Sequence, residues 1–179
     1  MFESAHANGR SSSAIRIATT ALITALVVAT TTMASAQGAN AGATNKMALV
    51  GSWLETVTFP PESGRPPLKS LGSFHADHTM VCSDQGAVTT TEPPSVFTSC
   101  HGVWTHLEKH KFAYTSFELI SDLSGNLVGY LKVRGIYTVS QSGNEYTGTS
   151  VAQILDPDGN VVFAVDVTNA GQRILVELP

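Results

Sequence analysis

Turn-forming segments recur at short, regular intervals through the second half of this sequence, and they limit its fold more than any other feature. Each contains Gly together with Asn, residue types that adopt the backbone angles of tight turns with little strain. The segments separate stretches rich in β-branched and aromatic residues, which favour strands. They lie at 122–126, 141–144, 156–160 and 169–171. Because loops this short join neighbouring strands only in antiparallel fashion, the pattern predicts a meander.

The predicted meander has five strands. They cover residues 112–121, 127–139, 145–155, 161–167 and 172–178. The first half of the chain adds less regular strands, which we expect at 50–59, 69–76, 79–83 and 99–107. The prolines of 60–67 cannot donate ladder hydrogen bonds, so we expect a loop there, and we expect a second long loop at 84–94.

Eight or nine sequential antiparallel strands are most simply arranged as a closed up-and-down barrel. Closure removes exposed strand edges and leaves an interior that can hold one small ligand. The prediction is therefore an all-β barrel. A β-sandwich of two sheets is the alternative, although the meander lacks the long crossing connection of a Greek key.

The first 36 residues have the order of features found in a cleavable secretory signal. Arg10 and Arg16 supply positive charge, residues 17–28 are mainly apolar, and Ala34-Ser35-Ala36 fits a cleavage site. An apolar run this short falls below the roughly 20 residues of a membrane-spanning helix, although an uncleaved tether is the alternative. We expect a signal at 1–36, a flexible leader at 37–45 and one secreted or periplasmic domain at 46–179, with no stable membrane anchor.

Charge and cysteine content fit an exported domain. Cleavage after Ala36 leaves eight basic and thirteen acidic side chains, with no Lys/Arg cluster, which argues against a nucleic-acid partner. Cys82 and Cys100 are the only two cysteines. In an oxidising compartment we expect them to form a disulfide worth about 3 kcal/mol, a free buried pair being the alternative.

Short motifs in this chain resemble those of a known group of barrels. Gly51-Ser52-Trp53 is similar to the Gly-x-Trp opening of lipocalin-like barrels, in which the Trp packs across the barrel floor. Residues 74–78, 100–104 and 156–162 resemble segments of small secreted calycin-like bacterial proteins. The resemblance implies a barrel with an apolar interior. Lipocalin-like barrels mostly bind small hydrophobic molecules, and the similar allene oxide cyclase-like barrels include cyclases and isomerases.

The five histidines of the predicted domain crowd into one third of it. They are His75, His78, His101, His106 and His110. Their spacing does not bring three or four onto one strand face, so we predict no metal site. His75 and His101 are the candidates for general acid or base at neutral pH. The alternative for both is a packed histidine bonded to a backbone carbonyl.

Strand 127–139 places Tyr130, Lys132 and Arg134 on one face. The ordinary arrangement exposes these residues to solvent. In the alternative, Arg134 turns inward and pairs with Glu118, because an unpaired buried charge is too costly. The candidate ligand-binding residues are Trp53, Trp104, Tyr114, Glu118 and Arg134.

The leading functional hypothesis is binding of a small hydrophobic molecule in the barrel lumen, without a cofactor. The chain has no Gly-x-Ser-x-Gly elbow, P-loop or dinucleotide-binding motif. A cyclase or isomerase is the first alternative. An extracellular module that contacts another protein through the proline-rich loops is the second.

Overall fold

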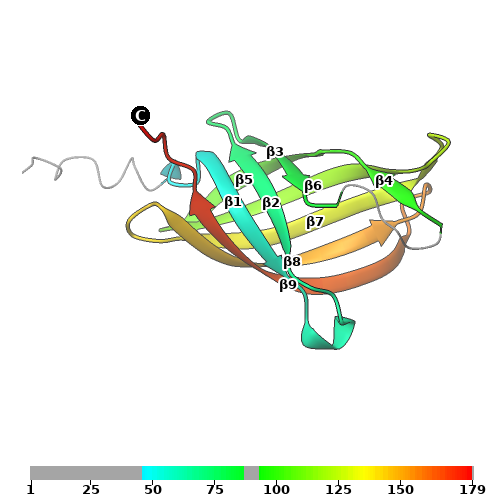
Figure 1. Ribbon diagram of the computed structural model, residues 1–179. Coiled ribbons are helices and arrows are strands. Elements are labelled where there is room, and N and C mark those ends of the chain that lie inside the picture. Colours follow the sequence, from blue (N-terminus) through cyan, green and yellow to red (C-terminus); the bar gives the residue numbers. More distant parts are fainter. Residues whose placement is uncertain (1–45, 87–92, 179) are drawn as a thin grey trace, which may run out of the picture. The chain divides into compact units, whose positions relative to one another are not determined.

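A computed structural model describes residues 46–86 and 93–178, and the predicted signal at 1–36 and leader at 37–45 lie outside the described residues. The described chain is almost entirely strand (Figure 1). Its elements are β1 (Gly51–Thr58), the short 3-10 helix η1 (Pro61–Ser63), β2 (Leu68–Phe74), β3 (Thr79–Asp84), β4 (Ser95–Phe97), β5 (Cys100–Glu108), β6 (Lys111–Asp122), β7 (Leu127–Val139), β8 (Glu145–Leu155) and β9 (Val161–Arg173).

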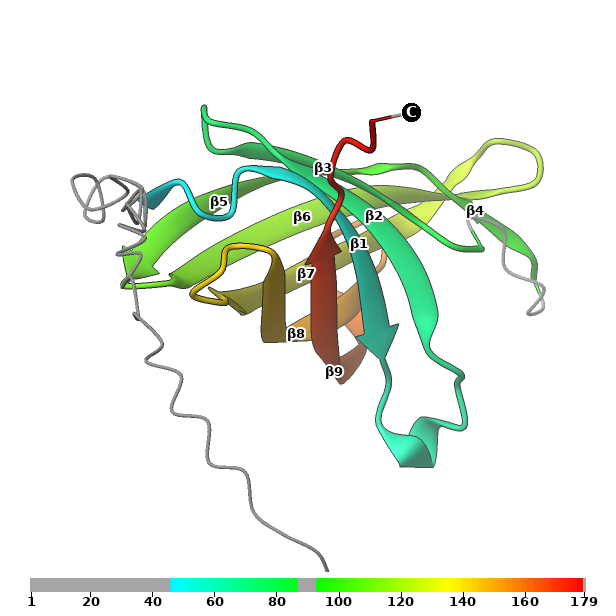
Figure 2. The ribbon, with the colours of Figure 1, turned by 60° about the vertical axis from the view of Figure 1, so that its left-hand side comes forward.

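Eight of these strands close into an antiparallel barrel. The hydrogen-bonded order is β1, β2, β3, β5, β6, β7, β8 and β9, and β9 pairs with β1 to complete the ring (Figure 2). The short strand β4 pairs with β6, where Phe97 lies opposite Ile120. The predicted up-and-down barrel is confirmed, and the alternative sandwich is excluded.

The turn residues predicted most of the strand limits in the second half. β7 and β8 begin and end at the predicted residues 127–139 and 145–155. The predicted turn at 169–171 and the strand at 172–178 are wrong, because β9 continues to Arg173. Gly171 lies opposite both Glu55 of β1 and Tyr146 of β8, so the strand is paired on both edges at that point. A Cβ atom at Gly171 would meet the Tyr146 ring, which explains the glycine by packing rather than by a turn.

One end of the barrel is closed by Trp53 and Arg173. The Trp53 side chain is fully buried, and its Nε1 donates a hydrogen bond of 2.9 Å to the carbonyl of Leu49. The Arg173 guanidinium lies 4.2 Å from the centre of a Trp53 ring and donates to the carbonyls of Ala48, Val50 and Gly143. The hydrogen bonds hold the segment before β1 across this end.

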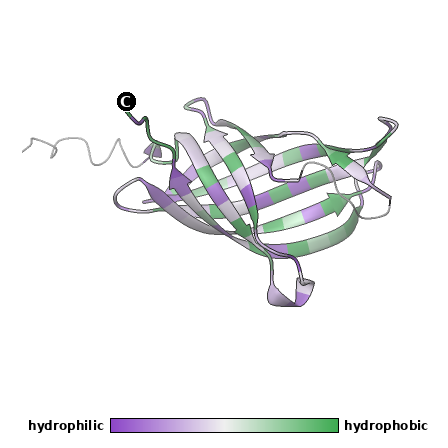
Figure 3. Cartoon of the chain, in the orientation of Figure 1, coloured by the Kyte–Doolittle hydropathy of each residue, from purple (hydrophilic) through white to green (hydrophobic). Residues whose placement is uncertain are grey.

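Trp53 and Arg173 together form a plug at this end of the barrel, and large side chains fill the interior beside it. The buried cluster consists of Leu49, Trp53, Phe74, Met80, Cys100, Trp104, Phe112, Tyr114, Tyr137, Val139 and Tyr146. Most of these residues come from the ends of the strands nearest Trp53, whereas Cys100 begins β5 at the other end, opposite Cys82. The hydrophobic core therefore lies mainly in the half of the barrel that contains Trp53. Figure 3 shows how hydrophobic and hydrophilic residues alternate along several strands, as expected when one face is internal and the other external.

The predicted disulfide is confirmed. Cys82 of β3 lies directly opposite Cys100 of β5, with Cα atoms 4.9 Å apart, and the bond joins the two strands inside the barrel. Within the described residues, no helix is long and apolar enough to cross a bilayer.

Candidate functional site

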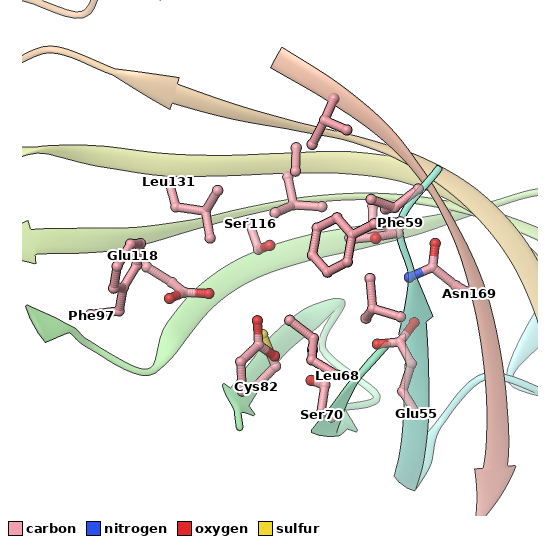
Figure 4. A pocket seen from close by; sticks show the side chains of 18 of the residues that line it. Glu55, Phe59, Leu68, Ser70, Cys82, Phe97, Ser116, Glu118, Leu131 and Asn169 are labelled. Atoms are coloured by element: carbon pink, nitrogen blue, oxygen red, sulfur yellow. The ribbon is translucent and has the colours of Figure 1, made fainter. Parts of the chain in front are cut away.

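A cavity of about 200 Å³ lies inside the barrel, in the half away from Trp53 (Figure 4). An apolar cavity of about 150 Å³ holds benzene, whereas sites for drug-sized ligands start near 300 Å³. The size therefore fits a molecule with a single ring or a short chain. The lining includes Glu55, Val57, Phe59, Leu68, Ser70, Cys82, Asp84, Phe97, Tyr114, Ser116, Glu118, Leu131, Val133, Tyr137, Tyr146, Ala152, Ile154, Phe163, Val165, Val167 and Asn169.

The period of two along each strand explains which side chains enter the cavity. On β1, Glu55 is in phase with the buried Trp53, so both point inward. On β6, Ser116 and Glu118 are in phase with the buried Phe112. The same alternation on β7, β8 and β9 supplies aliphatic and aromatic side chains. The cavity therefore has apolar walls from these three strands and carboxylates from β1, β3 and β6.

Hydrogen-bonded polar groups form the deep end of the cavity. The Tyr137 hydroxyl donates to Glu55 Oε1 at 3.0 Å. Ser150 Oγ donates to Asn169 Oδ1 at 2.7 Å and receives a hydrogen bond of the same length from the Tyr114 hydroxyl. Each of these groups is buried, so the bonds compensate for the water that the groups have lost.

Stacked aromatic rings connect these polar groups to the barrel plug. Tyr114 stacks on Tyr137 with ring centres 4.5 Å apart, and Tyr137 lies 4.3 Å from Tyr146. Tyr146 in turn lies 4.8 Å from Trp53. This continuous column gives the cavity a rigid floor, because none of the four rings can turn without displacing its neighbour.

Glu55 is held in an environment that disfavours its charged form. Burial raises the pKa of Glu55 to about 7, and hydrogen bonds from Tyr137 and Asn169 oppose the rise. The carboxyl group is thus able to exchange a proton near neutral pH. A proton donor or acceptor of this kind suits either ligand orientation or acid–base chemistry.

Glu118 and Asp84 form a second acidic group in the cavity. Burial raises the pKa of Glu118 to about 8, and the charge of Asp84 adds to the rise. Burial also raises the pKa of Asp84, while a hydrogen bond from Ser70 lowers it. In the described parts of the chain the one salt bridge joins Lys111 to Glu108 on the surface, so neither cavity carboxylate has a cationic partner there.

Two of the predicted ligand-binding residues, Tyr114 and Glu118, line the cavity. Trp53 and Trp104 are buried in the core but are not part of the lining. Arg134 is exposed on the outer face of β7, because Leu131 and Val133 take the inward positions. The alternative pairing of Arg134 with Glu118 therefore does not form.

The candidate catalytic histidines lie outside the cavity. His75 is exposed next to the β2–β3 turn, with Nδ1 3.2 Å from the Thr79 hydroxyl. His101 is exposed on the outer face of β5, between the inward-facing Cys100 and Gly102. The structure therefore does not bring either imidazole together with Tyr114 or Glu118.

Sequence reasoning missed several polar residues of the cavity. They are Glu55, Ser70, Asp84, Ser116, Tyr137, Tyr146 and Asn169. Ser150, which donates a hydrogen bond to Asn169, was missed as well. The alternation with Trp53 was enough to place Glu55 inside, once a tryptophan at this position was expected in the barrel floor. Asp84 was harder to place, because it ends its strand and was assigned to the following loop.

No group of three or more His, Cys, Asp or Glu side chains in residues 46–86 and 93–178 is arranged to hold a metal ion. Comparison with models of protein families, with curated proteins and with solved structures gives no match. The geometry of the cavity is therefore the basis for inferring what the protein does.

Proposed function

We propose that this protein binds a small, mainly apolar molecule in its barrel lumen. The observation that carries the proposal is the cavity of about 200 Å³, which combines aliphatic walls with a few polar groups at fixed positions. Binding sites for small molecules generally have this composition, because apolar contacts supply affinity and a few hydrogen bonds fix orientation. The rigid aromatic floor favours binding further, since it needs no ordering when a ligand enters.

We also propose that the chain acts after export and is related to the calycin-like barrels. The closed eight-stranded antiparallel ring and the buried Trp53 agree with that architecture. The Cys82–Cys100 disulfide is compatible with an oxidising compartment, such as the periplasm or the extracellular space. N-terminal sequencing of protein recovered from culture medium or periplasm tests this proposal, with Gln37 as the expected first residue.

A pair of matched variants tests lumen binding. Ala152 lines the cavity, whereas Ala164 is exposed on the outer face of the neighbouring strand. Ala152→Phe places a ring inside the cavity and should abolish the heat of binding of 2-phenylethanol in calorimetry. Ala164→Phe adds the same ring outside and should leave binding unchanged. Equal binding by the wild type and Ala152→Phe would contradict the proposal.

A cyclase or isomerase is the second candidate, and the environment of Glu55 favours it. A buried carboxyl group with a pKa near 7 is suited to moving a proton on a bound substrate. Incubation of the protein in D2O with the molecule that it retains on purification tests this activity. Deuterium incorporation that is lost in Glu55→Gln supports catalysis, and its absence in the wild type supports binding alone.

A further inference from the structure

Glu118 has an unusual position for a carboxylate. Its side chain is only 6 % exposed, and Figure 4 shows the carboxylate turned toward the cavity, near Phe97. No hydrogen bond or salt bridge joins this carboxylate to another group in the described parts of the chain. A buried charged group without a partner is costly, and native proteins normally supply one. The missing partner is therefore an indication of what the cavity binds.

The groups that surround Glu118 increase the need for positive charge. Asp84 of β3 is also acidic, and its charge raises the pKa of Glu118 further. Ser70 and Ser116 contribute hydroxyls, and β7 contributes the apolar Leu131.

Neither nearby cation neutralises these carboxylates. Arg65 is the only cation among the described lining residues, and its guanidinium lies 4.2 Å from the centre of the Phe59 ring instead of forming a salt bridge. Lys132 is on the outer face of β7, with Nζ 5.5 Å from the Phe117 ring centre. The cavity wall near Glu118 therefore carries two acidic groups and no balancing charge.

Apolar side chains lie at the same depth as these carboxylates. Leu131, Ile154 and Phe163 line the cavity from β7, β8 and β9, and Phe97 of β4 adds a further ring. A ligand that satisfies both surfaces has an apolar body and a positively charged hydrogen-bond donor. A neutral apolar molecule would leave Glu118 without a partner, and an anion would be repelled by the ionised forms of Glu118, Asp84 and Glu55.

We propose that the ligand is a small organic amine, whose ammonium group binds Glu118 and Asp84 while its single ring or short chain contacts the apolar wall. This inference rests on the proposed binding function and specifies the ligand class. An ammonium group donates three hydrogen bonds, and those to a carboxylate are stronger than neutral ones. The raised pKa of Glu118 agrees with this assignment, because burial and the charge of Asp84 disfavour the charged form of the carboxyl group.

Three probes of similar shape separate the ligand classes. Calorimetry near pH 8 compares 2-phenylethylamine, 2-phenylethanol and phenylacetate on the purified wild-type protein. We expect the amine to bind about tenfold or more tightly than the alcohol, the ratio that a hydrogen bond to a charged group supplies, and the carboxylate to bind least.

Two matched variants assign the preference to Glu118. Glu118→Gln keeps the side-chain size and should remove the preference for the amine, while the affinity for 2-phenylethanol is retained. Glu145→Gln makes the same change at an exposed position and should leave the preference intact. Retained alcohol binding shows that the Glu118→Gln lumen is folded, so loss of the preference is specific to the charge.

Three outcomes would contradict the inference, and each refutes a different part of it. If the alcohol binds as tightly as the amine, or phenylacetate binds best, the cationic ligand is refuted and lumen binding survives. If Glu118→Gln keeps the full preference for the amine, the role of Glu118 is refuted. If none of the three probes binds, lumen binding of single-ring molecules is refuted together with the inference.

Discussion

Replacing Glu118 with Gln is expected to stabilise the folded protein at alkaline pH, with little effect under acidic conditions. The pKa of this carboxyl is about 8 in the folded protein and 4.5 when it is unperturbed. The folded state therefore holds a proton that the unfolded chain has lost between these pH values. Stability falls as pH rises through this interval, since the unfolded state binds fewer protons. Gln cannot ionise, so the variant lacks this contribution.

The size of the effect follows from the pKa change. Each pKa unit corresponds to about 1.4 kcal/mol, so the whole change in pKa would lower the free energy of unfolding by roughly 5 kcal/mol. Glu118 faces a cavity that water can enter, and solvent screening reduces such energies, so we expect about 2 kcal/mol above pH 8. Asp84 and Glu55 have raised pKa values as well, so the variant should retain part of the pH dependence.

Urea denaturation, monitored by tryptophan fluorescence, measures the difference in stability between the wild type and the variant. The free energies of unfolding of the wild type and Glu118→Gln are compared from about pH 4 to about pH 9, a range that covers the folded and unfolded pKa values. Their difference should be near zero at the acidic end and should grow in favour of the variant as pH rises. A difference that stays constant with pH, or a variant that is less stable at alkaline pH, would refute the assignment of Glu118 as an unpartnered buried acid.

Three further outcomes are expected. Tyr137→Phe removes the hydrogen bond to Glu55 and should move the pKa of Glu55 above its present value near 7, which carbon-detected NMR titration measures; an unchanged pKa would contradict the role of that bond. Cys82→Ser together with Cys100→Ser should lower the free energy of unfolding by about 3 kcal/mol in urea titrations, and a loss below about 1 kcal/mol would count against the estimate. Arg173→Gln should lower the free energy of unfolding by about 2 kcal/mol through lost bonds to carbonyls at the closed end, while probe binding in calorimetry stays the same.

The sequence predicts the fold well where turn chemistry and strand period agree. Residues 141–144 contain Gly and Asn between two alternating stretches, and β7 and β8 end and begin beside them as expected. Residues 169–171 carry the same residue types but lie inside β9. The side chain of Asn169 receives a hydrogen bond from Ser150. Gly171 has no side chain, which leaves room for the Tyr146 ring. Composition alone does not distinguish these uses from a turn.

The site is less predictable from the sequence, because a period of two defines two faces without saying which is internal. On β7 the charged face proved external, and Leu131 and Val133 face the cavity. On β6 the face containing Tyr114 and Glu118 proved internal, although it also carries a charge. The distinction depends on neighbours that are distant in sequence, such as Asp84 of β3, and these neighbours are set only when the barrel closes.

The plug formed by Trp53 and Arg173 also determines how this molecule can be attached to something else. The segment that leads into β1 and the chain that leaves β9 both lie at this sealed end (Figure 1). Cargo, a surface linker or a reporter joined at this end would therefore be attached to the half of the barrel opposite the cavity. Immobilisation through this end would leave the half of the barrel that contains the cavity unmodified.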